Sequence, residues 1–348
     1  MKTVASMTAF APDRPLEKST VDRRDLRAHD VMIAIEYSGI CHSDIHTVRD
    51  EWGGCRYPMT PGHEIVGRIS EIGPAVTDFA VGDRVGVGCL VDSCGECEFC
   101  LAGQEENCSG GKAGTYNSVD LVDGSITQGG YSTHIPVKDD FLIRIPESLD
   151  PAAATPLLCA GITTYKPLAR WGAGPGKRVA VVGLGGLGHV ALKLAVAMGA
   201  EVWVVSHSHA KDDDALRFGA AGLIHTGDDP AALRAHPSEF DLIINTISAQ
   251  FEPADYMRML GPNGAMVLVG LPPEDLPVPA GSLTGGSKVL AGSNIGGIKE
   301  TQEMIDFCAA HGVTAEIELI NADQINEAYD RVVASDVRYR FVIDAATF

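Results

Sequence analysis

The sequence contains no run of 18 consecutive apolar residues, so it offers no candidate for a membrane-spanning helix. Basic residues are few, because 27 Lys and Arg stand against 46 Asp and Glu, for a formal net charge of −19. This charge disfavours a nucleic-acid partner or an anionic membrane surface. The opening residues, "MKTVASMTAFAPDRP", lack the long apolar stretch of a signal peptide, so we expect a cytoplasmic protein.

Internal repeats and low-complexity tracts are absent as well, and 348 residues, 45% of them hydrophobic, are enough for two domains. Short β-branched runs separated by turns predict a mainly β domain up to about residue 150, with strands at 31–40, 64–73, 83–91 and 142–146. Residues 151–171 have a helical pattern. The tail, with helices at 301–312 and 325–335 and a strand at 338–344, is predicted to return to the first domain.

Strands and helices alternate between these two parts, which predicts an α/β domain with a doubly wound parallel sheet. Helical patterns at residues 188–198 and 210–220 separate some of the strands. The predicted strands are residues 178–182, 201–205, 222–226, 241–245, 265–270 and 288–293.

A glycine-rich stretch follows the first of these strands and opens a helix. Gly183, Gly185 and Gly188 have the G-x-G-x-x-G spacing that lets a pyrophosphate reach a helix N-terminus. The alternative is a tight turn without a ligand. The predicted dinucleotide loop consists of Gly183, Leu184, Gly185, Gly186, Leu187 and Gly188.

The end of the next strand bears on the choice between NAD and NADP. An NAD site places an acid there, but the only acid of this strand, Glu201, lies at its beginning. The strand ends instead in Ser206, His207 and Ser208, followed by Lys211. Hydroxyls and a cation suit a 2′-phosphate, so NADP is the predicted cofactor. A polar loop without this role is the alternative.

Four of the nine cysteines lie within 15 residues. Cys94, Cys97, Cys100 and Cys108 have the spacing C-x2-C-x2-C-x7-C, which suits a closed tetrahedral site for a structural zinc ion. Without an export signal, clustered cysteines are more often metal ligands than disulfides. An iron–sulfur cluster or a set of disulfides is the alternative.

A second metal site is indicated by "PGHEIVG", which places His63 beside Glu64 just before a predicted strand. Both groups need compensation if they are buried. Cys41 and Cys159 would complete a Cys2His zinc site that keeps one position open, as a catalytic zinc requires. Glu64 is then either a fourth, displaceable ligand or a group that contacts a ligand. Each residue taken singly is also compatible with an ordinary core position.

Together these motifs resemble the zinc-dependent medium-chain dehydrogenases/reductases, and most closely their cinnamyl-alcohol-dehydrogenase-like branch, which includes bacterial broad-range aldehyde reductases. The resemblance runs through "CHSD", "EWGGCRYPMTPGHEIVG", the cysteine cluster, "GTYN", "GGYS", "PLLCAGITTY", "GLGGLGH", "IGGIKETQEM" and "YRFVID". It implies a GroES-like catalytic domain (residues 1–155 and 294–348) interrupted by a Rossmann domain (156–293). It also implies a homo-oligomer, for which we expect a dimer, with a tetramer as the alternative.

The resemblance further implies roles for residues around the catalytic zinc. Ser43, two residues after Cys41, is expected to contact the cofactor and to hydrogen-bond the substrate oxygen, and His46 is expected to exchange the proton with solvent. Asp44 is expected to orient a zinc ligand, with a local turn as the alternative. The positions that match the family's nicotinamide-side contacts are Thr163, Thr246, Gly270, Ser293, Asn294 and Ile295.

The roles of other residues near these motifs are left with alternatives. His42 is a candidate for cofactor phosphate or a plain surface residue, and Trp52 is a candidate for the substrate pocket or the core. The branch tends to have consecutive serines where His207 separates Ser206 from Ser208, which puts the strength of the NADP preference in question. Three remaining cysteines are interpreted as packing residues: Cys55, Cys89 and Cys308.

The sequence therefore predicts a two-zinc, NADP(H)-dependent alcohol dehydrogenase that mainly reduces aldehydes. One alternative is reduction of C=N or C=C bonds, known among relatives that often alter the zinc or proton-relay residues. Another is a non-catalytic zinc- and nucleotide-binding protein, which predicts a broken catalytic set. Since all candidate ligands, Ser43 and His46 are present, the sequence favours C=O chemistry.

Overall fold

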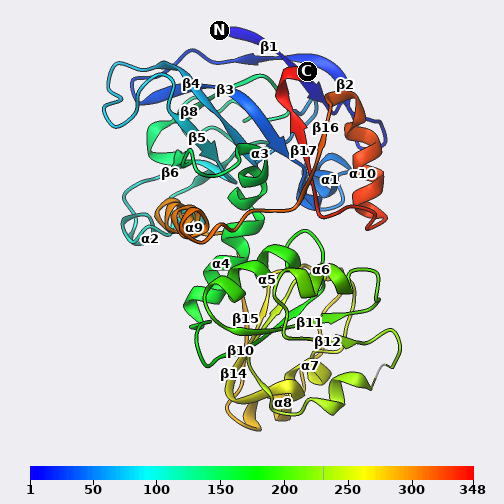
Figure 1. Cartoon of the computed structure of the whole chain (residues 1–348). Helices are drawn as coiled ribbons and strands as arrows, with labels where there is room; N and C mark the ends of the chain where they lie inside the picture. Colours follow the sequence, from blue (N-terminus) through cyan, green and yellow to red (C-terminus); the bar gives the residue numbers. More distant parts are fainter. Residues whose placement is uncertain (230) are drawn as a thin grey trace. The chain divides into compact units, whose positions relative to one another are not determined.

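The computed structural model describes residues 1–229 and 231–348, which form two compact units (Figure 1). Unit 1 comprises Met1–Cys159 and Gly296–Phe348, and unit 2 comprises Ala160–Ile295. The junctions thus fall after residues 159 and 295, where the sequence analysis placed them after 155 and 293. No helix within the described ranges is long and apolar enough to cross a membrane.

Unit 1 is mainly β, as predicted. Its main sheet has the order β16-β17-β3-β4-β5-β9, with β8 also paired to β3, and two smaller sheets pair β1 with β2 and β6 with β7. The strands are β1 (Lys2–Thr8), β2 (Glu17–Arg23), β3 (Asp30–Gly39), β4 (Ile65–Ile72), β5 (Arg84–Val87), β6 (Leu90–Ser93), β7 (Lys112–Gly114), β8 (His134–Lys138), β9 (Ile143–Arg144), β16 (Ile317–Ile320) and β17 (Arg340–Asp344). The helices are α1 (His42–Val48), α2 (Glu98–Leu101), α3 (Pro151–Ala154), α9 (Ile298–His311) and α10 (Ile325–Val333).

The end of the chain completes the sheet of unit 1. Strand β17 pairs antiparallel with β3, with Val342 opposite Gly39, and parallel with β16. Its side chains Phe341, Val342 and Ile343 are fully buried. In the structure the tail belongs to unit 1, and it carries Arg340 into the interior of that unit.

Two elements expected to be continuous are interrupted. Residues 83–91, predicted as one strand, form β5 and β6, and the break contains Gly88 and Cys89. The backbone there bonds outside the sheet, because the Thr115 amide donates to the Cys89 carbonyl (3.1 Å). The helical stretch 151–171 likewise divides into α3, a 3-10 turn (Thr155–Leu158) and α4 (Ala160–Arg170), with the break at Cys159. Hydrophobic pattern alone does not reveal such breaks.

Unit 2 has a six-stranded parallel sheet with the order β12-β11-β10-β13-β14-β15 (Figure 1). The central strand "RVAVV" is buried almost throughout, as expected where helices cover both faces of a parallel sheet. Its strands are β10 (Arg178–Val182), β11 (Glu201–Ser206), β12 (Gly222–His225), β13 (Phe240–Asn245), β14 (Leu260–Leu268) and β15 (Val289–Gly292). The helices are α4, α5 (Gly188–Ala197), α6 (Asp212–Arg217), α7 (Pro253–Met259) and α8 (Ala280–Thr284).

The strand order of unit 2 reverses between β10 and β13, which places a topological switch point at their carboxyl ends. The glycine-rich loop follows β10, and Thr246 follows β13. The Thr246 amide donates to the Val182 carbonyl (3.0 Å), so the two segments lie side by side. Ligands of open α/β sheets bind at such a point, and the predicted dinucleotide loop occupies it.

Gly188 is required for the close approach of α5 to this loop. A Cβ at Gly188 would lie 1.9 Å from the Gly183 carbonyl oxygen, whereas a Cβ at Gly185 would meet no heavy atom within 4 Å. Gly183 itself has a φ of +88°, which favours glycine.

We therefore expect Gly188→Ala to lower the free energy of unfolding by about 1–3 kcal/mol through overpacking. Gly185→Ala, the matched control, should unfold like the wild type. Thermal unfolding followed by circular dichroism measures both, and equal melting temperatures for the two variants would contradict the close packing at Gly188.

Candidate active site and metal centres

Four potential metal ligands from three segments meet inside unit 1. The candidate ligand atoms of Cys41, His63, Glu64 and Cys159 all lie within 4.8 Å of one another. Cys41 precedes α1, His63 and Glu64 precede β4, and Cys159 occupies the break before α4. The Cys41 and Cys159 sulfur atoms are 4.0 Å apart, and both cysteines are free. All four members of the predicted catalytic-zinc set are thus brought together, and we call them the Cys2HisGlu cluster.

Asp44 orients two members of this cluster, His63 and Cys41, through hydrogen bonds. Its Oδ1 lies 2.9 Å from His63 Nδ1, and its Oδ2 accepts a hydrogen bond from the Cys41 amide (2.9 Å). With Nδ1 of His63 turned to the carboxylate, Nε2 is the nitrogen left to bind a metal. The residue also caps the first turn of α1, so the contact to a ligand and the local turn proposed from the sequence coexist.

The titration behaviour of the cluster follows from these contacts. Burial would lower the pKa of His63, but the Asp44 carboxylate together with the sulfur atoms of Cys89 and Cys41 raises this pKa well above its usual value. The hydrogen bond between the two sulfur atoms lowers the pKa of Cys41 and raises that of Cys159. The thiol pair therefore shares a proton at the position where a metal would bind instead.

Glu64 is fully buried, and only one of its two carboxylate oxygens has a hydrogen-bond partner among the described residues. Its Oε1 accepts a hydrogen bond from Arg340 Nη2, whereas its Oε2 is buried without a hydrogen-bond partner among the residues that the structure describes. Burial raises the pKa of Glu64 to about 8, against the opposing charge of Arg340. An unpaired buried carboxylate oxygen is costly unless a metal satisfies it. The donor set of two thiols, one imidazole and this oxygen fits zinc.

Two further residues at this cluster were missed by the sequence analysis. Arg340 is the counter-charge of Glu64, and its motif "YRFVID" was noted only as part of the resemblance. Cys89, interpreted as a packing residue, is a neighbour of Cys159, whose side chain lowers the pKa of the Cys89 thiol. No local sequence pattern marks this role of Cys89, because the strand break that directs its side chain toward Cys159 is a feature of the tertiary structure.

The other predicted residues of this region lie along α1 and the loop after it. The His46 ring stacks on His42 (ring centroids 4.7 Å apart) and lies 4.8 Å from the Trp52 ring. Its Nδ1 contacts the carboxylate of Glu51. Trp52 is 53% exposed, so the alternative of a core tryptophan is wrong. Ser43 is half-buried on the first turn of the same helix.

The four clustered cysteines also converge in unit 1. Neighbouring sulfur atoms are 3.4–3.9 Å apart, and none of the four cysteines forms a disulfide. Four sulfurs about 2.3 Å from one tetrahedral ion would lie about 3.8 Å apart, so the arrangement fits a single zinc ion. Backbone amides, that of Cys100 first, lower the pKa of Cys97 to about 5 and favour its thiolate. The set comprises Cys94, Cys97, Cys100 and Cys108.

In unit 2, the predicted 2′-phosphate residues gather at the carboxyl end of β11. Ser206 Oγ donates to the Ser208 carbonyl (2.8 Å) and accepts from the Ser208 amide (3.2 Å). The Lys211 ammonium donates to the Leu184 carbonyl of the glycine-rich loop (3.1 Å), which places its charge beside that loop. His207 is exposed.

The remaining predicted cofactor residues also belong to unit 2. Thr246 Oγ1 donates to the Val182 carbonyl (2.8 Å), and the Ser293 amide donates to the Leu268 carbonyl (3.0 Å), so both lie at strand ends of the parallel sheet. Thr163 is buried on α4. Gly270, Asn294 and Ile295 complete the set at the same ends of β14 and β15.

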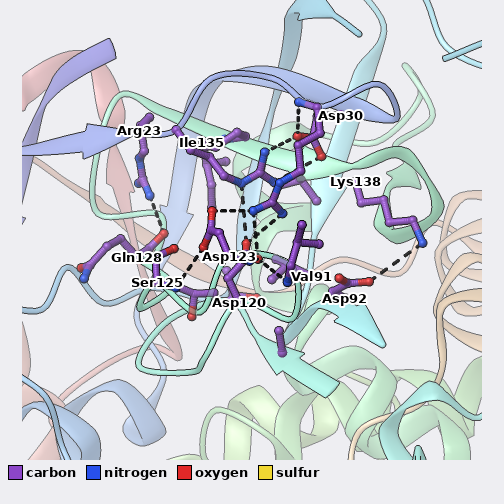
Figure 2. A pocket seen from close by; sticks show the side chains of 18 of the residues that line it. Arg23, Asp30, Val91, Asp92, Asp120, Asp123, Ser125, Gln128, Ile135 and Lys138 are labelled. Carbon is purple, nitrogen blue, oxygen red and sulfur yellow. Dashed lines mark hydrogen bonds and ion pairs between the residues drawn. The ribbon is translucent and has the colours of Figure 1, made fainter. Parts of the chain in front are cut away.

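A cavity of about 630 Å³ in unit 1 lies elsewhere (Figure 2). Arg27 forms a double hydrogen bond with Asp120 (2.9 and 3.0 Å) and a third with Asp123 (2.6 Å), and Arg24 contacts Asp30. These charges are compensated within the protein, and none of the candidate zinc ligands lines the cavity. It is therefore not the site of the chemistry predicted from the sequence.

Comparisons with known proteins agree with this organisation. The family model of the alcohol dehydrogenase GroES-like domain matches residues 27–147, and that of the zinc-binding dehydrogenases matches residues 186–310. An NADP-dependent alcohol dehydrogenase C of Mycolicibacterium smegmatis is 56% identical over 100% of this chain and 99% of its own. The aldehyde reductase YahK of Escherichia coli is 48% identical over 99% of both chains.

A solved structure is similar throughout. The cinnamyl alcohol dehydrogenase SbCAD4 of Sorghum bicolor superimposes with a TM-score of 0.95 at 43% identity, over 99% of this chain and 98% of that one. The same family is indicated by the two family models, by the full-length relatives and by the matching fold. The chain therefore belongs to the zinc-binding alcohol dehydrogenases of the medium-chain superfamily, in the branch that resembles cinnamyl alcohol dehydrogenase.

Proposed function

We propose that the chain is a zinc-dependent, NADP(H)-dependent alcohol dehydrogenase that acts mainly as a reductase of primary aldehydes, aromatic or of medium chain length. The observation that carries the proposal is the buried Cys2HisGlu cluster with its unpaired Glu64 oxygen. The names of the similar proteins, an NADP-dependent alcohol dehydrogenase and an aldehyde reductase, support the cofactor and the substrate class.

Cys41, His63 and Cys159 are the proposed ligands of the catalytic zinc, with Glu64 as a fourth, displaceable ligand. A zinc ion bound there polarises a carbonyl group, and NADPH supplies the hydride that reduces it. Asp44 fixes the tautomer of His63, and Arg340 offsets the charge of Glu64. These two contacts keep the cluster in one geometry, which differential binding of a transition state requires.

Ser43 and His46 are the proposed proton path. Ser43 is the second residue of α1, and its hydroxyl donates a hydrogen bond to the substrate oxygen. His46, on the same helix and in contact with Glu51, would exchange this proton with solvent. Asp44 stays a positioning residue, because both its oxygens are engaged by the protein.

The second zinc ion is proposed to be structural and to be held by the four clustered cysteines, since four thiolates leave no open position. The proposed assembly is a homodimer, and the proposed compartment is the cytoplasm. The homodimer follows from the family resemblance.

For the catalytic site, we expect His63→Ala to lower kcat/KM for aldehyde reduction at least about a thousandfold, or ~4 kcal/mol, because the polarising ion is lost. The variant should contain one zinc atom fewer per chain by mass spectrometry. The exposed His29 offers a matched control, since His29→Ala should keep both metal and activity. Wild-type turnover of a zinc-depleted His63→Ala would sink the assignment.

For the structural site, we expect Cys97→Ser to lose one zinc atom and to unfold at a lower temperature, because metal binding contributes to folding. Cys55→Ser removes a free thiol outside both sites and serves as the control. A Cys97→Ser variant with two zinc atoms per chain and an unchanged melting temperature would count against the four-cysteine site.

For the cofactor, we expect NADPH to be used with about a hundredfold higher kcat/KM than NADH. Two charge-assisted hydrogen bonds to the 2′-phosphate would contribute ~1.5–3 kcal/mol each, and solvent exposure reduces this contribution. Because ~1.4 kcal/mol corresponds to a tenfold ratio, the remaining energy supports a preference of about a hundredfold. Ser206→Asp should reverse much of the preference by repelling the 2′-phosphate, whereas Ser206→Ala should only weaken it. Steady-state kinetics with both cofactors decide this, and equal efficiency in the wild type would overturn the reading of this loop.

A further inference from the structure

A third group of potential metal ligands lies in unit 2, among residues that have no role in the chemistry above. The candidate ligand atoms of His209, Asp212 and His225 all lie within 4.8 Å of one another. The topology explains why they meet: β11 and β12 are parallel neighbours, with Ser206 opposite His225 at their carboxyl ends. The turn after β11 carries His209, and Asp212 begins α6.

Two imidazole nitrogens converge on one carboxylate oxygen. Asp212 Oδ2 lies 2.7 Å from His209 Nδ1 and 3.3 Å from His225 Nε2, and the two imidazole rings have centroids 3.7 Å apart. Two imidazoles and a carboxylate are the ligands preferred by zinc, nickel and copper rather than by calcium or magnesium. The group therefore differs from an ordinary acidic surface cluster in both its composition and its geometry.

Asp228 supports His209 from the other side. Its Oδ2 lies 2.7 Å from His209 Nε2, which leaves Nδ1 as the nitrogen directed toward Asp212. A histidine that donates its far N–H to a carboxylate is the usual arrangement around a bound metal ion. In His225, Nδ1 is buried without a hydrogen-bond partner among the described residues, so Nε2 is the end with a polar neighbour.

The local charge also favours a cation. Asp212, Asp213 and Asp214 are consecutive, and Asp228 and Asp229 lie on the facing loop. The carboxylates of Asp212 and Asp228 contact the two nitrogens of His209, and a bound divalent ion would offset their negative charge.

We propose that His209, Asp212 and His225 bind a third divalent metal ion of the zinc and nickel class, with Asp228 orienting His209. Water molecules complete the coordination of the ion, since His209 is exposed to solvent. This proposal does not rest on the catalytic assignment, because none of its ligands belongs to either zinc site of unit 1.

The test uses untagged holoenzyme that contains its two zinc atoms and no nucleotide, titrated with Ni2+ at mildly alkaline pH by calorimetry. Zinc content measured afterwards by mass spectrometry shows that nickel has added to the protein rather than displaced zinc. We expect one Ni2+ per chain in the wild type. Asp212→Asn and His225→Asn should each bind it at least about tenfold more weakly, and Asp228→Asn about 10–100-fold more weakly.

Matched controls separate ligation from charge. Asp213→Asn removes the same charge as Asp212→Asn from the adjacent, exposed position. Asp229→Asn likewise removes one negative charge next to Asp228, and it is the control for Asp228→Asn. Both controls should bind Ni2+ within about twofold of the wild type. The proposal is overturned if the holoenzyme binds no nickel beyond the zinc it releases, or if Asp212→Asn and Asp213→Asn bind nickel equally.

Discussion

The buried carboxylate of Asp44 is the constraint on which the active-site region depends. Oδ1 contacts His63 Nδ1 and accepts from the Gly62 amide (3.3 Å), while Oδ2 accepts from the Cys41 amide and from the Tyr131 hydroxyl (3.3 Å). One side chain thereby joins α1 to the loop before β4 and fixes Cys41 and His63 of the cluster. Breaking a buried charged contact of this kind typically costs about 3–5 kcal/mol, so the local fold and the site are stabilised together.

A second buried pair ties the cluster to the end of the chain. Arg340 opens β17, which is added to the sheet beside β3, and its guanidinium meets Glu64 in the interior. A Cβ at Gly39 would lie 2.1 Å from Glu64 Oε2, so this glycine leaves the space that the carboxylate occupies. The long return of the tail is thus part of the site, because it supplies the arginine that offsets the charge of the buried Glu64.

Much of this could be predicted from the sequence, for identifiable reasons. The glycine-rich loop, the parallel strands and the cysteine spacing are local patterns, and the two cysteines, histidine and glutamate of the cluster are chemically distinctive. Arg340, Cys89 and the His209 group could not, because each acquires its partners only through tertiary contacts. The breaks at Cys89 and Cys159 escaped for the same reason: apolar flanks predict continuous elements, whereas the packing around the cluster interrupts them.

The central claim is that the Cys2HisGlu cluster is a zinc site and not merely a set of buried polar groups. Anomalous diffraction from crystals of the purified protein, measured on both sides of the zinc absorption edge, tests it most directly. The account predicts one zinc peak bonded to Cys41, His63 and Cys159 and a second among the four clustered cysteines. A zinc peak at the four cysteines alone, with an ordered but metal-free cluster around Glu64 in fully active protein, would contradict it.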